Sequence, residues 1–154
     1  MAIARGAGTE IIRCHNFTAI NGTQKLIIGE QHHIYTVLSI VTYCFTQVDP
    51  TDTIGVRLIG WEGHVGTTQY EPMLFKATLS PNETHVWNDK FSFNGYEGTT
   101  HSGQFGAGDA AADLAYQNYI ADQGGSAVQS LEAIVADTDG NYTMIVTFID
   151  QNNS

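Results

Sequence analysis

The chain has 154 residues, a net charge of −10 and only six Lys and Arg residues. This length fits one domain with a single core, and a hydrophobic fraction of 42% excludes an intrinsically disordered chain. The shortage of basic residues disfavours nucleic acid and anionic membranes as partners, because both are bound mainly through Lys and Arg.

Charge is divided unevenly along the chain. All six basic residues lie within residues 1–90, and the chain after Lys90 carries eight carboxylates and no Lys or Arg. We interpret the acidic part as a solvated surface. The first nine residues, MAIARGAGT, are small and contain no apolar core of a signal peptide, so we expect a flexible N-terminal arm at 1–9 on a protein made and kept in the cytoplasm.

Strand patterns dominate the remainder of the chain. Runs rich in Val, Ile, Thr, Tyr and Phe, separated by Gly, Asn, Asp and Pro, predict strands at residues 10–18, 23–28, 33–47, 53–60, 72–79, 83–87, 90–93, 129–136 and 142–150. Eight to nine short strands predict an all-β, antiparallel, jelly-roll-like β-sandwich that occupies residues 10–154 as a single domain. Turn residues at 21–22 and 137–141 predict hairpins between the first two and the last two strands.

Two of the predicted strands are apolar on both faces. In residues 34–45 and 142–150, hydrophobic side chains occupy both alternating sets of positions. A sandwich normally leaves one face of each sheet in water, so these strands require a cover over the outer face. A partner subunit or an insertion of the chain itself would provide that cover.

One segment interrupts the strand pattern. Residues 98–127 begin with a glycine-rich stretch and continue as AAADLAYQNYIADQGG. Asp109 is a suitable N-cap and Gly124 a suitable stop, which predicts a short helical insertion near residues 109–122. The glycine-rich stretch 103–108 lacks the preceding strand and the Lys-[Ser/Thr] pair of a phosphate-binding loop, so we interpret it as a loop.

Catalytic and metal motifs are weak throughout. His32 and His33 are adjacent, and strand neighbours point to opposite faces, so a shared metal would need Glu30 or a distant ligand. The acidic loop 137–141 lacks the distal Glu of an EF-hand and is explained by a turn. We therefore predict no enzyme activity, no catalytic residue, no metal and no cofactor. Cys14 and Cys44 are interpreted as two buried free thiols, because a cytosolic location disfavours a disulfide.

The stretch THVWNDKFSFNG, residues 84–95, places a polar cluster between aromatic residues. We predict a structural corner at which the chain leaves one sheet and enters the other. Its residues are Trp87, Asp89, Lys90 and Phe91.

Four segments carry a resemblance to a known protein group. They are Thr-Gln-Lys at 23–25, His-Ile-Tyr-Thr-Val-Leu-Ser-Ile at 33–40, Asn-Glu-Thr-His-Val-Trp-Asn-Asp-Lys-Phe at 82–91 and Thr-Met-Ile-Val-Thr-Phe-Ile-Asp-Gln at 143–151. Together they resemble the small β-sandwich virion proteins of tailed bacteriophages. The resemblance covers most of residues 10–97 and 128–151, and the segment 98–127 falls outside it.

The resemblance implies a structural role without catalysis, as a capsid decoration (cement) protein or as a tail or fibre component. The implied location is the virion, and the implied partners are the major capsid protein and copies of the chain itself, with a trimer as one expectation. The division of charge suggests that the N-terminal arm docks on the capsid. The candidate docking residues are Ala2, Ile3, Arg5 and Arg13.

Other functions remain open at this stage. A carbohydrate- or receptor-binding module would stack exposed aromatic side chains on a host-surface glycan, and the candidates are Trp61, Tyr70, Tyr96 and Tyr116. A host protein of trimeric, cytokine-like jelly-roll form is disfavoured by the expected lack of a secretory signal.

Overall fold

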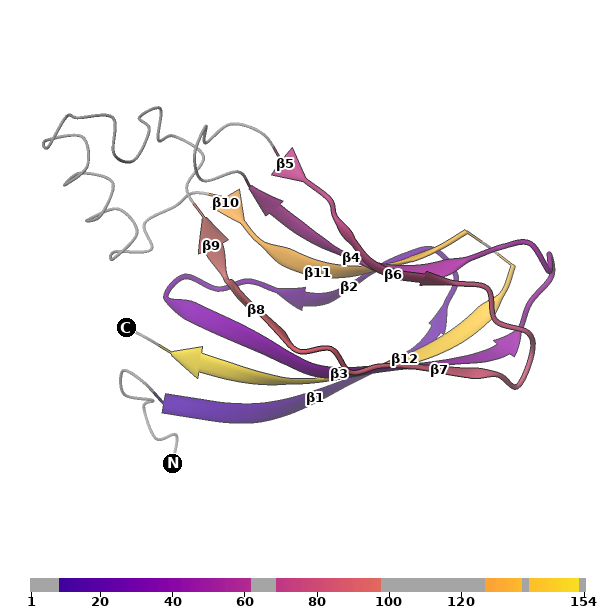
Figure 1. The fold of residues 1–154 in the computed structure, drawn as a ribbon, viewed down its shortest axis with the longest axis horizontal. Coiled ribbons are helices and arrows are strands. Elements are labelled where there is room, and N and C mark those ends of the chain that lie inside the picture. The colour runs from indigo at the N-terminus through magenta and orange to yellow at the C-terminus, as the bar shows by residue number, and fades with distance from the viewer. Residues whose placement is uncertain (1–8, 62–68, 98–126, 137–138, 153–154) are drawn as a thin grey trace, which may run out of the picture.

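The computed structural model describes residues 9–61, 69–97, 127–136 and 139–152. Every regular element in these ranges is a β-strand, and two antiparallel sheets form a sandwich-like arrangement, as predicted (Figure 1). The predicted helical insertion near 109–122 lies outside the described residues. Of the predicted N-terminal arm at 1–9, residues 1–8 also lie outside them, whereas Thr9 is the first residue of a strand.

The first sheet, sheet A, is built around the two long strands that are apolar on both faces. β12 (Asn141–Asn152) pairs with β3 (His33–Thr46) on one side and with β1 (Thr9–Ile20) on the other. The far edge of β3 is occupied by two short strands in succession, β7 (Thr84–Trp87) and β8 (Phe91–Asn94). The strand order is therefore β1-β12-β3-β7, with β8 beside β3 as well.

The second sheet, sheet B, has β11 (Ser130–Val135) between β2 (Thr23–Ile28) and β4 (Ile54–Trp61). The outer edge of β4 pairs with β6 (Met73–Ala77) over its first half and with β5 (Gln69–Tyr70) at its end. The jelly-roll form of the sandwich stays a prediction.

The two sheets meet at one end through a pair of very short strands, β9 (Tyr96–Glu97) and β10 (Ala127–Val128). Gly95 connects β8 to β9, and its N–H donates to the carbonyl of His33 at 2.8 Å. The backbone of Gln129 donates to the Gly95 carbonyl and accepts from Gly29, each at 2.9 Å. A Cβ atom at Gly95 would overlap the carbonyl oxygen of Glu30, so this crossing requires glycine.

The core lies between the sheets and follows the alternation of the strands. Along β12 the even-numbered residues Tyr142, Met144, Val146 and Phe148 are buried, and the odd-numbered ones face outward. They belong to the same buried cluster as Leu131, Ala133 and Val135 of β11. Because alternate side chains of a strand point to opposite faces, this one cluster defines an inner and an outer face for each sheet.

The predicted hairpins at 21–22 and 137–141 are wrong. β1 pairs with β12 and β2 pairs with β11, so the turn at Asn21-Gly22 carries the chain from sheet A to sheet B. The connection from β11 to β12 likewise runs from sheet B to sheet A. Each of these strands packs its buried face against the opposite sheet. Turn residues alone do not reveal whether the chain forms a hairpin within one sheet or crosses to the other sheet.

The predicted crossing at residues 88–90 is also wrong. β7 and β8 both pair with β3, so the chain stays on the same sheet edge on either side of Asn88, Asp89 and Lys90. Trp87 and Phe91 pack edge to face with ring centroids 5.5 Å apart, and both lie against the core. The polar cluster is thus a break in an edge strand, and the aromatic pair holds its two ends together.

Candidate functional site

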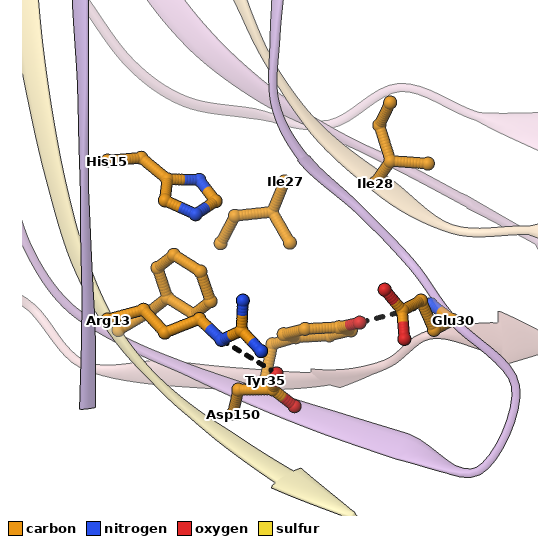
Figure 2. Close-up of a pocket in the computed structure, with 8 residues that line it drawn as sticks. Arg13, His15, Ile27, Ile28, Glu30, Tyr35 and Asp150 are labelled. Atoms are coloured by element: carbon orange, nitrogen blue, oxygen red, sulfur yellow. Dashed lines mark hydrogen bonds and ion pairs between the residues drawn. The ribbon is translucent and has the colours of Figure 1, made fainter. Parts of the chain in front are cut away.

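A cluster of polar side chains lies at the open edge of the sandwich between β1 and β2 (Figure 2). Asp150 of β12 is only 3% exposed and accepts from two neighbours. Its carboxylate lies 3.1 Å from Nε of Arg13 and 2.6 Å from Nδ1 of His33. The cluster therefore ties β1 and β3 to the strand between them, and the buried carboxylate is paired, as burial requires.

Tyr35 lies at the base of the same cluster. Burial raises the pKa of its phenol to about 12, and the hydrogen bond from the backbone N–H of Glu30, 3.1 Å from the phenol oxygen, opposes that rise. The hydroxyl therefore stays protonated throughout the physiological range. The carboxylate of Glu30 lies 3.5 Å from Nε2 of His33, which links the turn before β3 to the cluster.

The cavity lined by these residues has a volume of about 60 Å³. That is room for about two water molecules, far below the roughly 300 Å³ at which sites for small organic ligands begin. In the described residues no group of three or more His, Cys, Asp and Glu side chains could hold a metal ion. The ring nitrogens of His33 are directed to Asp150 and Glu30.

The outer face of sheet B carries an ion-pair network. Glu132 of β11 is 3% exposed, although its side chain lies on the face opposite to the core. Nζ of Lys25 approaches its carboxylate to 2.7 Å, and the Arg57 guanidinium donates to it and to Glu71. Burial alone would raise the pKa of Glu132, but the hydrogen bonds from Lys25 and Arg57 outweigh it and hold the pKa below its usual value.

The outer face of sheet A has the opposite character. One row of cross-strand neighbours consists of Ile12, Ile149, Thr36 and Ser92. Another consists of Asn16, Ile145, Val41 and Val86. None of these side chains is charged, and Glu10 near the start of β1 is the only charged residue of the five described strands whose position falls on this face.

Several apolar side chains on that face stand in solvent. Ile12 is 70% exposed and Val86 is 55% exposed, on strands at opposite edges of the sheet, and Ile145 lies on the strand between them. Tyr43 and Phe45 add an edge-to-face aromatic pair at the end of β3. No described strand packs over the face, so the cover that the doubly apolar strands require does not come from the described part of the chain.

Arg13 is the one predicted docking residue within the described part of the chain. Ala2, Ile3 and Arg5 lie outside the described residues, and Arg13 is engaged with Asp150 at the edge cluster. Of the candidate sugar-binding aromatics, Tyr116 and the side chains of Trp61 and Tyr96 also lie outside the described part, whereas Tyr70 of β5 is exposed.

Both cysteines are free, as predicted, but only Cys44 is buried. Cys14 is exposed, because its position on β1 lies opposite Thr147 on the outer face of sheet A.

Sequence reasoning missed both polar clusters. Asp150, His33 and Arg13 come from three strands that are far apart in the sequence, and no local pattern joins them. Glu132 did leave a signal, since it interrupts the apolar run LEAIV in a strand buried on nearly all positions. A lone carboxylate in such a run indicates a basic partner on a neighbouring strand.

No known protein-family model matches the chain, and no curated protein matches it either. Two solved structures are similar to it at low identity. One is a structure described as "Bacillus endospore appendages form a novel family of disulfide-linked pili", with a TM-score of 0.40 and 11% identity over 100% of this chain and 97% of that one. The other, from the infectious bursal disease virus Gx strain, has a TM-score of 0.33 and 9% identity over 92% of this chain. The aligned region spans 36% of the viral chain, and neither likeness carries a functional argument.

No helix in the described residues is long and apolar enough to span a membrane.

Proposed function

We propose that the protein is a non-enzymatic structural component of a bacteriophage virion, and specifically a capsid decoration protein that binds and stabilises the head lattice. The observation that carries the proposal is the outer face of sheet A. It is a partly apolar sheet surface with Glu10 as the one charged residue among its described strands, on a chain with a net charge of −10. Interface cores are depleted of charged residues in the same way, whereas solvent-facing sheets normally alternate with polar and charged side chains.

The resemblance to small virion proteins of tailed phages is concentrated in the same sheet. Of the four segments that carry it, 33–40 lies on β3, 82–91 spans β7 and the start of β8, and 143–151 lies on β12. These strands are direct neighbours in sheet A. Three of the four segments that carry the resemblance therefore belong to the sheet whose outer face is the proposed docking surface.

The strand order supports the jelly-roll form of the proposal. Sheet A runs β1-β12-β3-β7 and sheet B runs β2-β11-β4-β6, so that most successive strands alternate between the sheets. Eight principal strands in two four-stranded sheets are the architecture of jelly rolls, which occur in capsid proteins and in lectins. A fold does not by itself determine function, so the docking surface has to separate these two roles.

In this proposal the partner is the major capsid protein, and the outer face of sheet A lies against it. Contacts that bridge neighbouring capsid subunits stabilise the lattice by mass action and need no chemistry in the decorating protein. The polar clusters agree with a role that needs no catalysis, because basic groups of the same chain already bind the carboxylates of Asp150 and Glu132.

Binding to particles that lack the chain tests the proposal. Val86→Lys places a charge on the outer face of sheet A, and we expect it to reduce occupancy of the particle strongly. Ile28→Lys is the matched control, because Ile28 is also exposed, at 62%, but lies on β2 of sheet B. Equal binding of the Val86→Lys and Ile28→Lys variants would reject sheet A as the docking face.

Mass spectrometry of purified particles tests the location itself. We expect the chain in the particle fraction at a stoichiometry set by the capsid lattice. A chain that is absent from purified particles, or present only at the few copies of a tail component, would overturn capsid decoration. Binding to a glycan array that is lost on Tyr70→Ala would instead favour a carbohydrate-binding module.

A further inference from the structure

β1 lies at the edge of sheet A in the described part of the chain. It pairs with β12 in an unbroken register from Thr9 to Phe17, and no described strand pairs with its other edge. An edge strand exposes a row of backbone N–H and C=O groups that can pair with another chain. Proteins normally protect such edges with lysines, prolines, bulges or very short strands.

The other three edges of the sandwich are protected in these ways. The edge formed by β7 and β8 is broken at residues 88–90, where Asp89 and Lys90 stand. β6 has five residues, follows Pro72 and carries the exposed Lys76. β2 has six residues and shifts register against β11.

β1 lacks these devices over most of its length. It has 12 residues, no proline and no lysine, and its register shift occurs only between Phe17 and Ile20. Its two formal charges, on Glu10 and Arg13, cancel each other. Arg13 is further bound to Asp150 on the inner face, so its charge is already compensated within its own sheet.

We propose that β1 pairs antiparallel with β1 of a second copy of this chain, which extends sheet A across a two-fold axis. A two-fold axis perpendicular to the sheet places the outer faces of both copies on the same side of the extended sheet. One residue of β1 then lies at the axis, directly opposite the same residue of the second copy. Pairing centred on Ile12 places Ile12 opposite its counterpart and Ile11 opposite Arg13. Pairing centred on Arg13 would place two arginines opposite each other, which is unfavourable.

Charge favours a second copy as the occupant. The chain as a whole has a net charge of −10, so most of its surface repels another copy. The stretch from Thr9 to Phe17 has a net charge of zero and carries Ile12, which is 70% exposed, at the centre of the proposed pair. With Asp150, the partner of Arg13, counted as well, the edge carries one net negative charge per copy, so two acidic copies meet there with less like-charge repulsion than over the chain as a whole.

The pairing has a structural consequence. It joins the outer faces of two copies of sheet A side by side into one continuous surface whose described strands carry one charged residue, Glu10, per copy. The inference goes beyond the proposed function and does not depend on it, because the pairing concerns the purified chain alone.

Sedimentation analysis of three proteins tests the pairing. We expect the wild-type chain to be a dimer at micromolar concentration. We expect Ile12→Lys to raise the dissociation constant at least about tenfold, because two lysines would face each other across the axis. Val86→Lys is the matched control, since it adds the same charge to the same face at the opposite edge, and we expect it to remain dimeric.

Disulfide trapping tests the register. Directly opposed residues of antiparallel strands have Cα atoms about 4.5–5.5 Å apart, which is within disulfide range. The variant Ile12→Cys with Cys14→Ser should therefore form a covalent dimer under mild oxidation, whereas Val86→Cys with Cys14→Ser should not.

Three results would overturn the inference. One is a monomeric wild-type chain, a second is loss of the dimer with both lysine variants, which would indicate association through the sheet face, and the third is a dimer that Ile12→Lys leaves intact. The proposed function fails separately, since a β1-paired dimer that is absent from particles rejects only the virion role. A monomer that decorates particles rejects only the pairing.

Discussion

The outer faces of the two sheets differ in the side chains that they present to solvent. Sheet B covers its outer face with its own side chains, since Lys25 and Arg57 lie on the carboxylate of Glu132 and the second arm of Arg57 reaches Glu71. Sheet A leaves Ile12, Val86 and Ile145 in solvent. Apolar side chains stand in solvent on sheet B as well, since Ile28 is 62% and Met73 is 44% exposed. The two outer faces therefore differ in charge, because only that of sheet B carries an ion-pair network, and this difference is why we propose sheet A as the docking face.

The largest expected effect on stability concerns the crossing at Gly95, where the two sheets meet. Gly95→Ala should lower the free energy of unfolding by about 3 kcal/mol or more, because the added Cβ overlaps the backbone of Glu30. Gly22→Ala is the control, since a Cβ at Gly22 meets nothing within 4 Å. Urea denaturation measures both, and equal stability of the two variants would show that the sheets do not depend on this crossing.

The next effect concerns the ion-pair network of sheet B. Glu132→Gln removes the buried carboxylate but leaves Lys25 and Arg57, and we expect a loss of about 2 kcal/mol. Glu71→Gln removes the exposed partner of Arg57 and should cost about 0.5 kcal/mol or less. If the Glu132→Gln variant unfolds at the wild-type urea concentration, the network does not stabilise sheet B.

The same carboxylate gives sheet B a pH dependence. The pKa of Glu132 is lower in the folded protein than its usual value of 4.5, so its contribution to stability is complete above that pH. The contribution is lost as the pH falls through the folded-state pKa. The difference in unfolding free energy between wild type and Glu132→Gln should therefore be constant from pH 7 to about pH 5 and shrink at lower pH. A difference that grows on acidification would contradict this assignment.

The smallest expected effect concerns the exposed face of sheet A. Val86→Lys should change the unfolding free energy of the purified chain by only about 0.5 kcal/mol, because the side chain is already 55% exposed. Its effect should be seen in particle binding. A loss of about 2 kcal/mol or more is typical of substitutions at buried side chains. Such a loss would mean that Val86 belongs to the core, and it would contradict the proposal that this face docks on a partner.

The sequence was sufficient to predict the strands but not their arrangement. All nine predicted strands are present, because alternation and β-branched residues are local signals, and the three missed strands, β5, β9 and β10, have two residues each. The sheet crossings were assigned to the wrong places. Asn21-Gly22 crosses between sheets, and Asn88-Asp89-Lys90 stays on one edge. Pairing is decided by partners that lie far away in the sequence, and turn residues do not encode it.

The candidate surfaces, too, could be predicted from the sequence only in part. The apolar outer positions of β3 and β12 are visible in the sequence as strands with hydrophobic residues of both parities, and the structure places them on the outer face of sheet A. The expected cover over this face stays a prediction. The pairing of Arg13 with Asp150 was not visible, because it depends on the register of β1 against β12. Arg13 had been assigned to capsid docking on its charge alone.

A cryo-electron-microscopy map of the source particle tests the central claim most directly, because it shows what lies against sheet A. We predict density for this chain repeating over the capsid lattice, with the outer face formed by β1, β12, β3 and β7 buried against capsid protein and the ion-pair face of sheet B directed to solvent. A map that places the chain on the capsid with sheet A facing solvent, or that lacks the chain at the capsid, would contradict the account.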